Sequence, residues 1–127
     1  MTQNRPVNIN LLKIKLPLSA FLSITHRISG ILIFFIVLPV SVFIFSELTQ
    51  SQDSFNNFMV MYHKNLGIKF GCVGLILIFQ YHIFTGVRHI LMDFHILNES
   101  LSSSYKSAVI TLVLFAVNAL LTLWVML

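Results

Sequence analysis

Two short stretches of this sequence place ionisable side chains inside otherwise apolar segments. YHIFTGVRHILMD at residues 81–93 carries two histidines, an arginine and an aspartate, and SITHRISG at residues 23–30 carries a histidine–arginine pair. Charged side chains are costly at membrane depth, so an ionisable residue in an apolar segment usually faces a protein interior or water and often marks a functional site. These two stretches are therefore the candidates for such a site.

Helical spacing gathers each set of side chains on one face. Four residues of the first stretch stand at i, i+3, i+4 and i+7: Ser23, His26, Arg27 and Gly30. Four residues of the second stand at i, i+4, i+7 and i+11: His82, Gly86, His89 and Asp93. Arg88 points toward a different face, and His82 lies about 9 Å deeper than Arg88, because a helix rises about 1.5 Å per residue. His82 is thus the residue least suited to lipid.

These residue types permit redox chemistry around a bound cofactor. A neutral imidazole at the depth of His82 can be an axial ligand of haem iron, and Gly86 on the same face would let a flat macrocycle approach. An arginine can hold haem propionates through bidentate pairs, and a serine with an arginine could hydrogen-bond a quinone carbonyl. A plainer interpretation stays open, in which His82 hydrogen-bonds a neighbouring helix and Arg88, His89 and Asp93 form an interfacial cap facing headgroups and water.

The composition predicts an all-α membrane protein with three transmembrane helices. The 127 residues are 57% hydrophobic and 9% charged, with a mean hydropathy of +0.88, whereas a soluble domain carries about 25% charged residues. Three apolar runs are long enough to span the hydrocarbon core, at about 21–46, 66–92 and 107–127. Lipid requires the backbone of each run to be satisfied internally, and none alternates as a barrel strand does. We expect one membrane domain over residues 1–127.

The distribution of positive charge orients the chain. Most basic residues fall on the side of the N-terminus and the second loop: Arg5, Lys13, Lys15, Arg27, Arg88 and Lys106. The positive-inside rule then places the N-terminus in the cytoplasm and brings both ionisable stretches to the cytoplasmic ends of their helices, at one depth. The net charge of +4 is explained by this orientation, and it does not indicate a nucleic-acid partner.

Other features refine the layout. Pro39 should bend the first span, residues 47–64 are expected to be a solvated connection, and the serines of the loop at about 94–105 are expected to start the third span. GIKFG at 67–71 has the small-xxx-small spacing that allows close helix approach. We expect no cleavable leader, because the first apolar run is too long, and we expect no internal repeat.

The chain resembles the cytochrome b-type membrane anchor subunit of succinate dehydrogenase. The resemblance rests on RPVNINL at 5–11, LSITHRISG at 22–30 and YHIFTGVRHILMDF at 81–94, in order and with the family's three-helix layout. It implies that His82 is the axial ligand of haem b, that Ser23 and Arg27 line the ubiquinone site, and that His26 and Arg27 lie near the haem propionates. Arg88 and His89 match the pattern without an assigned role, and His63 and His95 lie outside it.

The same resemblance implies the partners and the activity. The second axial ligand would come from a second small membrane-anchor subunit, which packs with this chain into a haem-binding bundle. A flavoprotein subunit and an iron–sulfur subunit would dock on the cytoplasmic face, so this chain performs no dehydrogenation itself and helps pass electrons from succinate to ubiquinone. The expected location is a bacterial cell inner membrane, or a mitochondrial inner membrane if the chain is encoded in the organelle.

Three alternatives remain open. A haem-free anchor would keep the quinone site without the iron. A proton or ion transporter would need polar residues at several depths, whereas Asn118 is the notable polar group of the third span. A self-contained haem site would use His26 and His82 as an intrachain pair of ligands.

Overall fold

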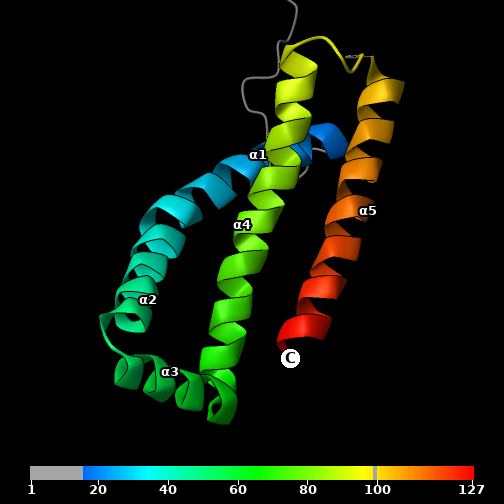
Figure 1. Cartoon of the computed structure of the whole chain (residues 1–127). Helices are drawn as coiled ribbons and strands as arrows, with labels where there is room; N and C mark the ends of the chain where they lie inside the picture. The colour runs from blue at the N-terminus through cyan, green and yellow to red at the C-terminus, as the bar shows by residue number, and fades with distance from the viewer. Residues whose placement is uncertain (1–15, 99) are drawn as a thin grey trace, which may run out of the picture.

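The structure, a computed structural model, describes residues 16–98 and 100–127, and every regular element in this part of the chain is a helix (Figure 1). Three helical runs are long and apolar enough to cross a membrane: Leu18–Gln50, Leu66–Asp93 and Leu101–Met126. The predicted all-α membrane fold with three spans is therefore confirmed, although the third helix begins at Leu101 and not at residue 107. The RPVNINL stretch at residues 5–11, Lys13 and Lys15 lie outside the described residues.

The first span is bent, as Pro39 predicts. It consists of α1 (Leu18–Leu32), the π-helical segment η1 (Ile33–Val37) and α2 (Leu38–Gln50), and α1 and α2 run in different directions (Figure 1). Pro39 has no N–H to donate to the carbonyl four residues earlier, at Phe35, and its ring crowds that carbonyl. The wider π turn absorbs this disruption. The bend lets α1 lean across α4 at one end of the bundle.

The connection at residues 47–64 is mostly helical, and most of its residues are exposed. The segment α3 (Gln52–Lys64) crosses from the end of α2 to the start of α4 (Figure 1). The Ser51 hydroxyl caps it by accepting from the Ser54 N–H at 3.1 Å. Asp53 in the first turn and Lys64 in the last suit the helix dipole. The polar composition of this segment predicts a connection without regular structure, whereas the segment contains a short amphipathic helix.

The helices α4 (Leu66–Asp93) and α5 (Leu101–Met126) run side by side through the molecule (Figure 1). The predicted serine start of the third span is confirmed, since the Ser100 hydroxyl caps α5 by accepting from the Ser103 N–H at 3.3 Å. Deeper in the bundle, the Gln80 amide of α4 donates to the Thr122 hydroxyl of α5 at 2.8 Å. These two helices form the frame against which α1 is placed.

A Schellman motif ends α4 at His95. The backbone φ of His95 is 58°, the left-handed conformation that usually needs glycine. Its N–H donates to the Met92 carbonyl at 2.8 Å, and the Ile96 N–H donates to the Leu91 carbonyl at 3.0 Å. His95 therefore acts in the turn between α4 and α5, consistent with its position outside the predicted site pattern.

The buried side chains gather mainly at the end of the bundle away from α3. Those of α1, α4 and α5 in this half are Leu22, Ser29, Thr85, Arg88, Ser104, Ala108 and Thr111. Many of them are polar, and large apolar side chains such as Phe34, Phe35 and Phe45 are exposed. A surface of this kind suits lipid or neighbouring membrane subunits.

Candidate functional site

The two ionisable stretches meet, as the topology predicts. The His26 Nδ1 of α1 lies 2.8 Å from the Thr85 hydroxyl of α4, and the His82 Nδ1 of α4 lies 2.9 Å from the Ser29 hydroxyl of α1. The Thr25 and Tyr81 hydroxyls form a third contact between the same helices. The convergence of residues 23–30 and 81–93 at one level of the bundle is confirmed.

Three imidazoles form a cluster at this crossing. The rings of His26 and His82 are stacked, with centroids 4.1 Å apart and planes 14° from parallel. The His89 ring is tilted by 46° against that of His26, at a centroid distance of 5.1 Å. His89 thus packs into the cluster and does not simply face headgroups. Over the described residues no group of three or more histidine, cysteine or acidic side chains is arranged to hold a metal ion alone.

Two glycines allow this close approach. A Cβ atom on Gly30 would lie 3.2 Å from Cε1 of His82, and one on Gly86 would lie 3.1 Å from Cε1 of His26. Each glycine therefore accommodates the imidazole of the facing helix. The side chain that approaches Gly86 in this structure is the imidazole of His26.

Arg88 belongs to the interface between α4 and α5, so its predicted place in an interfacial cap is wrong. Its side chain is only 3% exposed. Its Nε donates to the Ser107 hydroxyl, and its Nη2 donates to the hydroxyl and the carbonyl of Ser104, each at 3.1 Å. No described carboxylate forms an ion pair with it, so neutral oxygens of α5 solvate the guanidinium in place of water.

The remaining predicted residues lie around the cluster. His26 packs against α4, whereas the neighbouring Arg27 side chain is exposed and Ser23, one turn earlier, is half-buried. Asp93 is exposed at the end of α4. The predicted face of α1 therefore divides, with His26 and Gly30 turned toward α4 and Arg27 turned outward. His63, outside the predicted pattern, is exposed on α3.

The hydroxyl partners of the two histidines are not among the predicted site residues, although the sequence holds a signal for them. HRISG at 26–30 and HIFTG at 82–86 both read His-x-x-Ser/Thr-Gly. This five-residue element occurs once on each helix of the crossing. In both copies the hydroxyl and the glycine lie against the histidine of the other copy.

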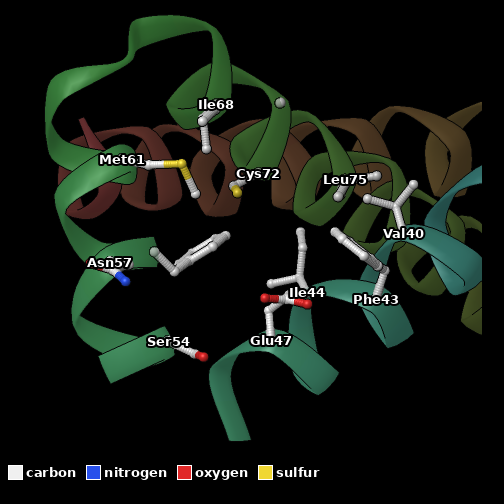
Figure 2. Close-up of a pocket in the computed structure, with 12 residues that line it drawn as sticks. Val40, Phe43, Ile44, Glu47, Ser54, Asn57, Met61, Ile68, Cys72 and Leu75 are labelled. Atoms are coloured by element: carbon white, nitrogen blue, oxygen red, sulfur yellow. The ribbon is translucent and has the colours of Figure 1, made fainter. Parts of the chain in front are cut away.

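A separate cavity of about 520 Å³ lies at the other end of the bundle, between α2, α3 and α4. Its walls are mostly apolar, with Phe43 and Met61 among them, and Glu47 points toward it (Figure 2). Cys72, expected to pack in the core, is half-buried at its wall. None of the predicted site residues lines this cavity. The candidate site is therefore the imidazole cluster.

Comparisons with known proteins agree on one family. The model of the family described as "Succinate dehydrogenase/Fumarate reductase transmembrane subunit" matches residues 1–123. The succinate dehydrogenase cytochrome b556 subunit of Coxiella burnetii is 36% identical over 93 residues, covering 73% of this chain and 74% of that one. The succinate dehydrogenase cytochrome b560 subunit of Porphyra purpurea is 32% identical over 106 residues, which cover 83% of each chain. That of Chondrus crispus is 32% identical over 100 residues, or 72% of each.

Proposed function

This chain belongs to the transmembrane subunit family of succinate dehydrogenase and fumarate reductase, as a cytochrome b-type anchor. We propose that it shares haem b with a second membrane subunit and helps form a ubiquinone-reduction site. The observation that carries this proposal is the environment of His82, a half-buried imidazole inside an apolar bundle with one ring nitrogen already hydrogen-bonded. Succinate oxidation then belongs to partner subunits.

The residues around His82 fit a single axial ligand of haem iron. Its Nδ1 is hydrogen-bonded to the Ser29 hydroxyl at 2.9 Å, and its Nε2 makes no hydrogen bond with a described residue. Histidines that bind metals typically have the other ring nitrogen fixed in this way. A haem group bound here would supply one-electron chemistry, and the chain would supply the ligand, its orientation and a surrounding of low polarity.

The second iron ligand is best supplied by another chain. His26 is the neighbouring histidine, but its ring is stacked on that of His82 with centroids 4.1 Å apart, a van der Waals distance that leaves no space for a porphyrin between them. Two axial ligands must bind from opposite faces of the macrocycle. This geometry speaks against the intrachain pair and supports a histidine of a second small membrane subunit.

Arg27 and His26 are proposed to lie near the haem propionates. Arg27 is exposed beside the imidazole cluster, and a guanidinium forms strong bidentate pairs with carboxylates. His26 is anchored to Thr85 and cannot leave the crossing without breaking that hydrogen bond. Both side chains come from the turn of α1 that faces the end of α4.

Ser23 and Arg27 are proposed to bind the ubiquinone. They lie one helical turn apart in α1, and they combine a hydroxyl donor with a fixed positive charge. A quinone oxygen gains negative charge on reduction, so donors placed at that oxygen stabilise the reduced forms. Electrons from succinate would reach this end through an iron–sulfur subunit and a flavoprotein subunit on the cytoplasmic face of the inner membrane, where the positive-inside rule places it.

The proposal is tested on the intact complex by its subunit composition and its reduced-minus-oxidised spectrum. His82→Ala should remove the b-type bands or weaken them at least about tenfold, because the iron loses an axial ligand. His63→Ala is the matched control, since this histidine is exposed on α3, and it should keep the wild-type spectrum. Wild-type haem content in the His82 variant would reassign the ligand, and a wild-type complex without b-type bands would leave a haem-free quinone anchor.

A further inference from the structure

The crossing of α1 and α4 is built from the two copies of His-x-x-Ser/Thr-Gly in a reciprocal arrangement. His26 contacts the hydroxyl of the copy on α4, and His82 contacts the hydroxyl of the copy on α1. Ser29 and Thr85 are 5% and 1% exposed, so water does not compete for these hydrogen bonds. The crossing therefore determines the hydrogen-bonding state of both imidazoles.

The direction of the hydrogen bond to His82 follows from the second contact of Ser29. Its hydroxyl lies 2.7 Å from the carbonyl oxygen of His26, and a carbonyl can only accept. With the single hydroxyl proton on that carbonyl, the Ser29 oxygen is an acceptor toward His82. In this arrangement Nδ1 of His82 is the donor, and a neutral ring that donates through Nδ1 has its lone pair on Nε2.

The same reasoning applies to the other copy. The Thr85 hydroxyl donates to the Tyr81 carbonyl at 2.8 Å, so its oxygen accepts from Nδ1 of His26, also at 2.8 Å. In this arrangement both imidazoles donate through Nδ1, as a neutral ring with its lone pair on Nε2 does. Stacked rings suit this state, because two imidazolium ions at a centroid distance of 4.1 Å would repel each other.

We infer that Ser29 is a positioning residue that holds His82 in the Nδ1–H tautomer, with the lone pair on Nε2, and that Thr85 holds His26 in the same tautomer. The consequence for iron rests on the proposed haem function, whereas the tautomer itself does not. An imidazole that donates its Nδ1 proton is a more basic ligand at Nε2. A more basic ligand favours ferric over ferrous iron, so Ser29 should lower the reduction potential of the haem.

The first test uses the intact complex with Ser29→Ala, Ser29→Thr and the control Ser41→Ala, which removes an exposed hydroxyl elsewhere in the same span. Loss of the hydrogen bond should weaken ferric haem binding about tenfold. If ferrous binding is unchanged, the one-electron reduction potential of the haem rises by about 59 mV. The electron paramagnetic resonance spectrum of the low-spin ferric haem should also shift. Ser29→Thr keeps the hydroxyl and should restore both values. A Ser29→Ala complex that retains haem with the wild-type potential and spectrum would overturn the role at the iron.

A second measurement tests the tautomer without relying on the iron. In a haem-free complex labelled with ¹⁵N-histidine, where no iron occupies Nε2, the His82 resonances identify which ring nitrogen carries the proton. We expect Nδ1–H in the haem-free wild-type and Ser41→Ala complexes and a majority of Nε2–H in the haem-free Ser29→Ala complex. A proton on Nε2 of His82 in the wild-type complex would overturn the inference. A wild-type complex that is isolated without haem and carries the proton on Nδ1 would instead contradict the proposed function alone.

Discussion

The two ends of the bundle are held together by different kinds of contact. At the end where α1 crosses α4, hydroxyls, imidazoles and a buried arginine join three helices. At the other end, α2, α3 and α4 surround a largely apolar cavity, and the glycines Gly71 and Gly74 of α4 face open space. Polar contacts fix one arrangement because each donor needs its acceptor, whereas apolar surfaces accept many neighbours. The polar contacts at the imidazole end therefore hold its side chains in one arrangement. The apolar surface at the α3 end suits contact with lipid or a partner.

The largest difference in stability between the two ends should appear when one basic side chain is removed from each, Arg88 at the imidazole end and Lys69 at the other. Arg88→Leu deletes three hydrogen bonds to α5 and leaves the buried Ser104 hydroxyl without its arginine partner, although the Ser107 hydroxyl still donates to the Ser104 carbonyl. The loss should cost about 3 kcal/mol. Lys69→Leu removes a partly exposed ammonium that donates to the Leu127 carbonyl at 3.2 Å and should cost well under about 1 kcal/mol. The thermal denaturation midpoint of the complex measures both, and equal shifts would show that Arg88 is not central to the packing of α4 against α5.

A second pair of variants tests how closely the helices approach. Gly86→Ala places a Cβ 3.1 Å from the His26 ring, whereas Gly74→Ala meets nothing within 4 Å. The first substitution should cost about 1–3 kcal/mol through overpacking and should disturb the haem spectrum, because His26 is stacked on His82. The second should be neutral or slightly stabilising, since alanine favours helix more than glycine does. A spectrum left unchanged by Gly86→Ala would show that the stack is not part of the haem environment.

The sequence predicts those features of the two ends that depend on a single segment of the chain. The lengths of the apolar runs predict the spans, Pro39 predicts the bend, and the depth of the two ionisable stretches predicts their meeting. The partners of Arg88 cannot be predicted in the same way. They depend on the register of α5 against α4, and Ser104 lies in a segment whose composition predicts a loop. Side-chain contacts between helices follow from the crossing geometry, which no single segment encodes.

A third pair of variants separates quinone binding from assembly. Arg27→Leu should lower ubiquinone reduction at least about tenfold, because a fixed charge at the developing oxyanion is lost, while succinate oxidation by artificial acceptors stays near wild type. Ser23→Ala should show the same pattern to a smaller extent. Lys64→Leu, an exposed cation on α3 at the other end, should change neither assay. Parallel losses in both assays with Arg27→Leu would indicate failed assembly in place of a quinone site.

The smallest expected change in stability comes from substituting one histidine at each end of the bundle. The test is whether the stability rises or falls. His95→Gly relieves a left-handed backbone with a φ of 58° and should stabilise the complex by about 0.5–1 kcal/mol, less the loss of the 3.0 Å contact between His95 Nδ1 and the Asp93 carbonyl. His63→Gly places glycine within α3 and should destabilise it by roughly 0.5 kcal/mol. The denaturation midpoint should therefore rise with the first substitution and fall with the second. If both lower it equally, the hydrogen bond of His95 outweighs its backbone strain, and the turn that joins α4 to α5 is held by that side chain.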